Sequence, residues 1–115
     1  IVDDEPNIVM SLEYTFKKNN FEVYIARDGQ EALDILEEKI PNIIILDVMM
    51  PKVDGYETLK QIKQNPKLNN VKVIFLSAKT KETDIEKGLQ LGANAYMTKP
   101  FSIKKLVEQV NVLLG

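Results

Sequence analysis

Two spacings of apolar residues alternate along the chain. Short runs of consecutive apolar residues predict strands, whereas apolar residues three or four positions apart predict helices. The strand-like runs lie at residues 1–2, 23–26, 43–46, 73–76 and 95–97. The runs at 43–46 and 73–76 contain no polar residue, which is typical of strands in a parallel sheet that is covered on both faces.

A helical pattern follows each of these runs. Pro6 suits the first turn of the first helix, and Asp28 opens the second with a capping-box-like sequence. The third helix is expected to stop before Pro66, the fourth to end at Gly92 and the fifth to be capped by Ser102. The expected core-facing residues of the five helices are Ile8, Leu12 and Phe16; Ala32, Leu33 and Leu36; Tyr56, Leu59 and Ile62; Ile85 and Leu89; and Ile103, Leu106, Val107, Val110, Leu113 and Leu114.

Five alternating strand and helix units predict an α/β fold. We expect a doubly wound, five-stranded parallel sheet of order 2-1-3-4-5 between two helix layers, which is a flavodoxin-like (βα)5 three-layer sandwich. A closed barrel would need about eight such units. The first strand has only two apolar residues, so we expect it to be shortened at its N-terminus, because strands usually run to about five.

The composition of the chain excludes several kinds of site. Its 115 residues are 44% apolar and 28% charged, as expected for one globular domain. There is no cysteine and no histidine, which excludes thiolate chemistry, Ser-His-Asp triads and metal sites built on those side chains. The net charge is −2 and fourteen of fifteen cations are lysine, so we expect no direct nucleic acid binding. No apolar run approaches the roughly 20 residues of a membrane helix, and we expect a cytoplasmic domain without membrane contact.

Polar residues follow four of the five predicted strands. Asp3 and Asp4 follow the first strand, Asp47 the third and Ser77 the fourth, and Lys99 comes shortly after the fifth. Because the carboxyl ends of parallel strands lie along one edge of a sheet, we expect these side chains to meet. Asp47 directly follows four apolar residues, so its carboxylate is expected to need a nearby cation.

Taken singly, these residues have ordinary structural explanations. Asp4 and Glu5 would complement the dipole of a helix N-terminus, and Ser77 would cap a turn. Lys99 would be a solvated surface lysine, and Tyr96 would pack against a helix. Their joint occurrence at matched strand ends is much less expected by chance, so we interpret them together.

Three carboxylates, a hydroxyl and an ammonium group suit phosphoryl transfer. Crowded carboxylates stay ionised only near a cation, and a small number of oxygen ligands suits Mg²⁺. An aspartate can itself attack phosphorus and form an aspartyl-phosphate. The five glycines form neither a P-loop nor a dinucleotide fingerprint, so we expect no nucleotide cofactor.

These residues stand in recognisable motifs. The motifs are Val2-Asp3-Asp4-Glu5-Pro6, Leu46-Asp47-Val48-Met49-Met50-Pro51, Asp54-Gly55, Leu76-Ser77-Ala78 and Lys99-Pro100-Phe101. In this order and at these strand ends, the chain resembles the receiver domain of response regulators in two-component signal transduction. The resemblance covers essentially the whole chain, so we expect residues 1–115 to form a single receiver domain.

The resemblance implies a role for each residue near the strand ends. Asp47 matches the phosphoacceptor, and Asp3 and Asp4 match the acidic pair that holds Mg²⁺ together with Asp47. The backbone carbonyl of Met49 matches a further metal ligand. Lys99 matches the lysine that pairs with the phosphoryl group, and a cis peptide bond is usual before the equivalent of Pro100. Ser77 matches the hydroxyl that hydrogen-bonds the phosphoryl group and shifts on activation. Tyr96 matches the aromatic residue whose rotamer follows that hydroxyl.

The same resemblance implies the partners. The phosphoryl group would come from the phosphohistidine of a sensor histidine kinase or of a histidine phosphotransfer protein. The fourth helix, fifth strand and fifth helix would form the output surface for an output domain or a target protein, with Lys104, Lys105 and Glu108 as candidate contacts. A homodimer that forms on phosphorylation also fits the resemblance, as does either a free-standing regulator or a receiver within a longer protein.

Three functions fit the residues. The first is a regulatory phosphoacceptor domain that is not a conventional enzyme and catalyses only its own phosphorylation and dephosphorylation. The second is a phosphatase with an aspartyl-phosphate intermediate, although Met49 stands where such enzymes commonly have a general acid. The third is an interaction module on the same fold that works without phosphorylation, which the intact set of polar residues disfavours.

Overall fold

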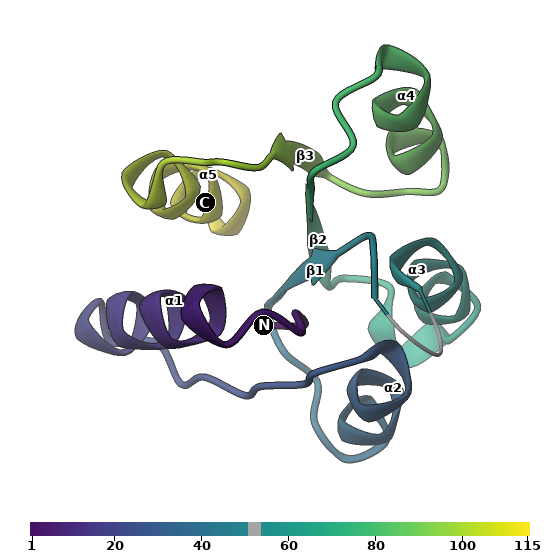
Figure 1. Cartoon of the computed structure of the whole chain (residues 1–115). Coiled ribbons are helices and arrows are strands. Elements are labelled where there is room, and N and C mark those ends of the chain that lie inside the picture. Colours follow the sequence, from purple (N-terminus) through teal and green to yellow (C-terminus); the bar gives the residue numbers. More distant parts are fainter. Residues whose placement is uncertain (51–53) are drawn as a thin grey trace.

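The computed structural model describes residues 1–50 and 54–115, and in it a parallel sheet lies between two layers of helices. Helices α1 and α5 cover one face of the sheet, and α2, α3 and α4 cover the other (Figure 1). The elements in chain order are α1 (Pro6–Lys18), α2 (Gly29–Glu38), β1 (Ile43–Asp47), α3 (Gly55–Lys63), the 3₁₀ turn η1 (Pro66–Leu68), β2 (Lys72–Ser77), α4 (Glu82–Gln90), β3 (Ala95–Thr98) and α5 (Ile103–Leu114).

The sheet has the predicted order, but its first two positions are single bridges. Strands β1, β2 and β3 pair in parallel in that order. Val2 forms parallel bridges to Leu46 on one side and to Ala26 on the other, which completes the order 2-1-3-4-5. The expected strands at 1–2 and 23–26 are therefore wrong as regular strands.

Helices α1, α2 and α5 begin where the sequence predicts, and side chains cap the starts of α2, α3 and α5. The side chains of Asp28, Asp54 and Ser102 each accept a hydrogen bond from the backbone N–H three residues on. Such caps satisfy donors that a helix leaves unpaired at its N-terminus. Pro6 occupies the first turn of α1, where its missing N–H costs nothing.

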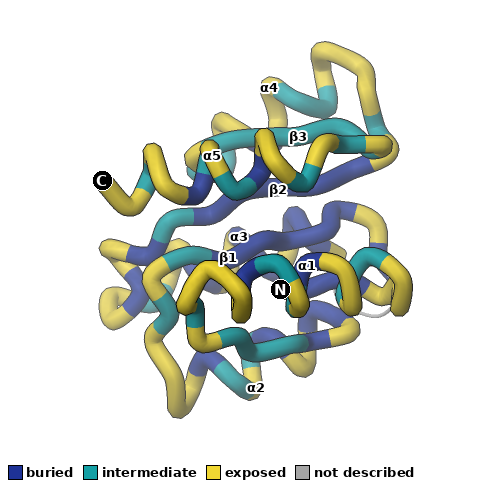
Figure 2. Tube along the Cα trace, turned by 90° about the vertical axis from the view of Figure 1, so that its left-hand side faces the viewer, coloured by how far each residue is buried: buried dark blue, intermediate teal, exposed yellow. Residues whose placement is uncertain are grey.

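Two apolar cores, one on each face of the sheet, hold the layers together. The buried residues are concentrated along the central strands (Figure 2). Leu12 of α1 and Leu106 of α5 are fully buried against one face, and Leu59 of α3 against the other. The prediction for α4 is wrong in detail, because Leu89 is 45% exposed and the buried residue of this helix is Gly88. No helix in the two described segments is both long and apolar enough to cross a membrane.

Candidate functional site

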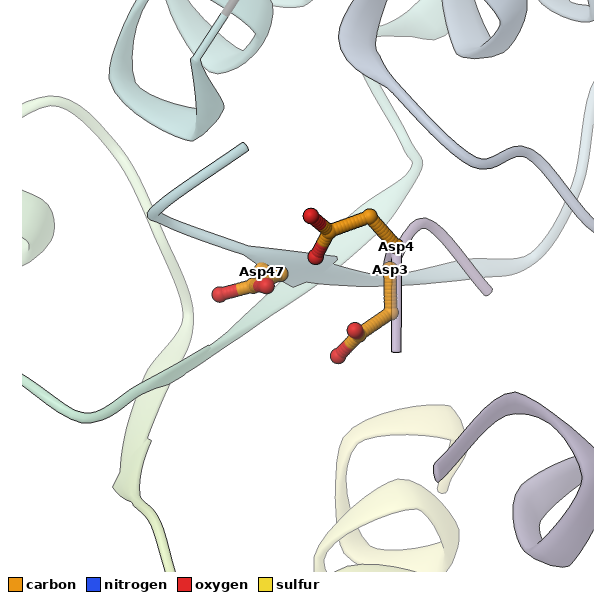
Figure 3. Close-up of side chains that lie close together, drawn as sticks. All are labelled: Asp3, Asp4 and Asp47. Carbon is orange, nitrogen blue, oxygen red and sulfur yellow. The ribbon is translucent and has the colours of Figure 1, made fainter. Parts of the chain in front are cut away.

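The acidic residues meet at the carboxyl end of the sheet, as the strand positions predict. Asp3 follows the bridge at Val2, and Asp47 is the last residue of β1. The backbone N–H of Asp47 donates to the carbonyl of Val2 at 2.8 Å, so the two segments are joined directly beside the acids. The side chains of Asp3, Asp4 and Asp47 gather at this end of the strand (Figure 3).

These three carboxylates form a cluster that suits a metal ion. One oxygen from each of Asp3, Asp4 and Asp47 lies within 4.8 Å of the others. Asp3 is 1% exposed and Asp47 is 3% exposed, whereas Asp4 is open to solvent. The cluster is therefore reached from the side of Asp4. A site with only oxygen donors and an open side suits Mg²⁺, which keeps several of its waters when bound to protein.

Backbone hydrogen bonds orient the two buried acids. Oδ1 of Asp3 accepts from the N–H of Glu5 at 2.8 Å, and Oδ1 of Asp47 accepts from the N–H of Met49 at 3.2 Å. In each case the donor lies two residues further along the chain, as in an Asx turn. The second oxygen of each carboxylate is left to face a cation, and both face Lys99.

Lys99 is the cation that the buried acids require. Its Nζ lies 3.2 Å from Oδ2 of Asp3 and 3.4 Å from Oδ2 of Asp47. Its shortest ion pair, at 2.7 Å, is with Oε1 of Glu5. The peptide bond between Lys99 and Pro100 is cis, as the family resemblance implies.

The role of Glu5 was missed by the sequence reasoning. Glu5 is the N-cap of α1, but its side chain makes no capping hydrogen bond and turns to Lys99 instead. Its position directly after two acids of the site was the only available signal. A glutamate has a longer side chain than an aspartate, so it reaches an ammonium group that lies beyond the acidic pair.

Burial has the largest effect on the pKa values of the two buried acids. Burial raises the pKa of Asp47 to about 6, and the charge of Asp3 adds to the increase while Lys99 opposes it. Burial likewise raises the pKa of Asp3. Burial lowers the pKa of Lys99, but its hydrogen bond to Glu5 and the charges of Asp47 and Asp3 outweigh that effect and raise it to about 12. The lysine therefore stays charged at every physiological pH.

Ser77 and Tyr96 both form hydrogen bonds with the backbone of Lys79. Ser77 ends β2 and is fully buried, and its Oγ accepts a hydrogen bond from the backbone N–H of Lys79 at 2.9 Å. The hydroxyl of Tyr96 in β3 donates to the carbonyl of Lys79 at 3.0 Å. Within residues 1–50 and 54–115, neither side chain forms an ion pair or a hydrogen bond with Asp3 or Asp47.

The segment after Asp47 carries the remaining motif residues. Met49 is 56% exposed, and its backbone is tied to Asp47 through the hydrogen bond described above. Pro51 of the same motif lies outside the described residues. Gly55 closes the segment, because its N–H donates to the carbonyl of Val48 at 2.9 Å. The start of α3 is thereby held against the end of β1.

Comparisons with known proteins agree with this geometry. Residues 1–111 match the family model described as the response regulator receiver domain. The alkaline phosphatase synthesis transcriptional regulatory protein PhoP of Bacillus subtilis is 43% identical over 114 residues, which make up 99% of this chain and 47% of PhoP. The chain thus spans about half the length of this relative.

Two solved structures have the same fold and are at least 30% identical in sequence to this chain. The receiver domain of the Francisella response regulator 1452 has a TM-score of 0.91 and 35% identity, with 98% of this chain and 92% of that chain covered. The BeF3-activated DrrB receiver domain has a TM-score of 0.89 and 30% identity, with coverage of 98% and 92%.

Proposed function

The chain belongs to the response regulator receiver domain family, and from this premise we propose that Asp47 accepts a phosphoryl group from a phosphohistidine. Members of this family are regulatory domains of two-component systems rather than classical enzymes. The observation that carries the proposal is the pairing of one lysine, Lys99, with two buried aspartates at the carboxyl end of the sheet. That arrangement offers a nucleophile and a cation to the same incoming group.

The proposed reaction moves a phosphoryl group from nitrogen to oxygen. A carboxylate oxygen of Asp47 attacks phosphorus, the P–N bond breaks, and its electron pair leaves with the imidazole of the donor. Burial raises the pKa of Asp47 only to about 6, so the nucleophile is mostly ionised at neutral pH. The ammonium group of Lys99 lies near Asp47 and can offset charge that develops on the phosphoryl oxygens.

Asp3, Asp4, Asp47 and the backbone carbonyl of Met49 would hold Mg²⁺. The donor set fits this ion, because three carboxylates offer oxygens within 4.8 Å of one another. The charge balance fits it too, since Asp3 helps to raise the pKa of Asp47 and a cation would relieve their repulsion. When bound, Mg²⁺ would offset the negative charge of the phosphoryl group and help to orient it.

Ser77 and Tyr96 would transmit phosphorylation to the surface. A phosphoryl group adds roughly one unit of negative charge and three acceptor oxygens at Asp47. The hydroxyl of Ser77 would turn from the N–H of Lys79 to the new oxygens, and the ring of Tyr96, which packs against Phe75, would move in response. Because both residues are held by Lys79, their movement would shift the loop between β2 and α4. The surface of α4, β3 and α5 would change as a result.

The partners follow from the same proposal. A sensor histidine kinase or a histidine phosphotransfer protein would supply the phosphoryl group in the cytoplasm. An output domain or a target protein would read the surface of α4, β3 and α5, and phosphorylated copies would pair through it. The relative PhoP, a transcriptional regulatory protein, is about twice as long as this chain. Its length supports the proposal that a further domain responds to phosphorylation of the receiver.

Treatment with acetyl phosphate and Mg²⁺ tests the proposal directly. The wild-type chain should gain one phosphoryl group by intact mass, and the gain should disappear when Mg²⁺ is chelated. Asp47→Asn should gain none, whereas Asp34→Asn, which removes an exposed aspartate of α2, should behave like wild type. An unmodified wild-type chain, or equal modification of Asp47→Asn, would refute the assignment.

A further inference from the structure

Three aromatic rings pack in a row beneath α4. The ring of Phe75 in β2 meets Tyr56 of α3 edge-on, with centroids 5.6 Å apart and an interplanar angle of 74°. On its other side Phe75 meets Tyr96 of β3, with centroids 6.0 Å apart at 64°. Phe75 is fully buried and Tyr56 is 9% exposed. The row therefore links α3 with β3 through the sheet, directly under α4.

Both tyrosines contact Lys79 in the loop before α4, since the ammonium of Lys79 lies 5.6 Å from the centroid of the Tyr56 ring, but only Tyr56 also reaches Asp84 and Lys87 within the helix. Tyr96 bonds to Lys79 in the loop before the helix, whereas the hydroxyl of Tyr56 donates to the carbonyl of Asp84 within α4 at 3.4 Å. The ammonium of Lys87, one turn further along α4, lies 4.4 Å from the centroid of the Tyr56 ring. Burial raises the pKa of Tyr56 to about 12, so its hydroxyl stays protonated as a donor at neutral pH.

Helix α4 has few other contacts that would hold it. Its only buried residue is Gly88, whose backbone lies so close to Phe75 and Tyr96 that a Cβ would be 3.0 Å from each ring. Leu89, the large apolar residue beside it, is 45% exposed. No leucine or isoleucine of this helix is fully buried, so a hydrogen bond and a cation over a ring contribute a large share of its attachment.

Tyr56 is also tied to the backbone of the phosphoacceptor. It follows Gly55, which packs so closely on Asp47 that a Cβ at position 55 would overlap the Asp47 carbonyl oxygen. The N–H of Gly55 donates a hydrogen bond to the carbonyl of Val48, the residue after Asp47. Gly55 and Tyr56 thus connect the end of β1 to the ring that contacts α4.

We propose that Tyr56 is a positioning residue that holds α4 in the position described here through Asp84 and Lys87, and thereby sets how readily phosphorylation of Asp47 moves this helix. The regulatory half of this inference rests on the proposed function, whereas the attachment of α4 by Tyr56 does not. Loss of the attachment favours the moved state, and by linkage the protein then binds a phosphoryl group or its mimic more tightly.

Amide hydrogen exchange of the whole chain, without any phosphodonor, tests the attachment. Tyr56→Leu removes the ring and the hydroxyl, Tyr56→Phe removes the hydroxyl alone, and Lys87→Met removes the cation but keeps an unbranched apolar side chain. We expect exchange in α4 to accelerate about tenfold for Tyr56→Leu and about threefold for each of the other two, with exchange in α1 unchanged. The double variant Tyr56→Leu/Lys87→Met should match Tyr56→Leu, because the ring and the cation act as one contact.

The chain offers a matched control pair away from α4. The ammonium of Lys39 lies 5.8 Å from the ring centroid of Tyr24, whose hydroxyl donates to Glu22. Tyr24→Phe and Lys39→Met make the same chemical changes and should leave exchange in α4 unaltered. Unchanged exchange in α4 for both Tyr56→Leu and Lys87→Met would overturn the inference, as would equal acceleration in the control variants.

Titration with beryllofluoride and Mg²⁺ tests the regulatory half. Amide chemical shifts of α4 should report a midpoint that is about fivefold lower in Tyr56→Leu and Lys87→Met than in wild type. If wild type responds but neither variant shifts the midpoint, the regulatory half of the inference is overturned while the proposed function stands. No response even in wild type would refute the proposed function together with the regulatory half, while the exchange measurements would still decide whether Tyr56 holds α4.

Discussion

Asp47→Asn is expected to stabilise the protein in the absence of a metal ion. The Asp47 side chain is 4% exposed and lies beside the buried Asp3, with a single lysine for both. An ionised carboxylate in that place is less favourable than in the unfolded chain, where it is fully hydrated. Asparagine has the same shape without the charge, so the substitution removes this cost with little change in packing.

The magnitude follows from the pKa of Asp47. Burial raises it from 3.8 to about 6, so between these pH values the folded protein binds more protons than the unfolded chain. Stability therefore falls as the pH rises through this window, and the full cost is present above pH 6. At roughly 1.4 kcal/mol per pH unit, the cost is at most about 3 kcal/mol. Asp47→Asn should gain up to this amount at pH 7.5 and little near pH 3.5, where the Asp47 carboxyl group is mostly protonated in both the folded and the unfolded state.

Urea denaturation followed by circular dichroism measures this difference. The midpoint of Asp47→Asn should exceed that of wild type at pH 7.5, and the gap should close as the pH is lowered towards 3.5. Asp34→Asn should follow wild type at every pH. Added Mg²⁺ should stabilise wild type, by about 2.7 kcal/mol at a hundredfold excess over its dissociation constant, and should stabilise Asp47→Asn much less. A less stable Asp47→Asn at pH 7.5, or a gap independent of pH, would show that the buried charge is not costly.

Three further substitutions probe the site and its support. Lys99→Met leaves the buried acids without their cation, so the pKa of Asp47 should rise above 6 in an NMR titration. Modification by acetyl phosphate should slow at least about tenfold, and an unchanged rate would contradict the role of the lysine. Glu5→Gln removes the shortest ion pair of Lys99, so the pKa of this lysine should fall in the same titration, and an unchanged pKa would contradict the pairing. Gly55→Ala places a Cβ against the Asp47 carbonyl and should lower the unfolding free energy by about 3 kcal/mol in urea; an unaltered midpoint would show that α3 can shift without cost.

Local patterns in the sequence were sufficient for most of the architecture. The apolar runs at 43–46 and 73–76 lie in strands β1 and β2. They were easy to recognise, because a strand that is buried on both faces consists of consecutive apolar residues. Caps such as Asp28 and Ser102 placed the helix starts, since a cap acts within three residues of chain. The prediction failed at Leu89, because a thin apolar stripe does not reveal that a glycine packs closest to the sheet.

The acidic cluster was predictable for a topological reason. Parallel strands bring their carboxyl ends to one edge, so Asp3, Asp47 and Lys99 had to lie near one another once the strands were identified. Ser77 was likewise placed at the end of its strand, but its hydrogen-bond partner was not predictable. The partner depends on the path of the loop after β2, which no apolar pattern describes.

The sequence by itself determined the order of the elements and the set of side chains at the edge of the sheet, because each of these depends on periodicity or on position relative to a strand end. The strand order was an expectation from common doubly wound folds, and the pairing in the structure confirmed it. Only the tertiary structure decided which atoms meet. The ion pair of Glu5 with Lys99 joins residues 94 positions apart, and the contact of Tyr56 with Asp84 joins residues 28 apart. Such contacts depend on side-chain length and direction and on how the helices pack on the sheet, and these are set by the whole fold rather than by any local stretch of chain.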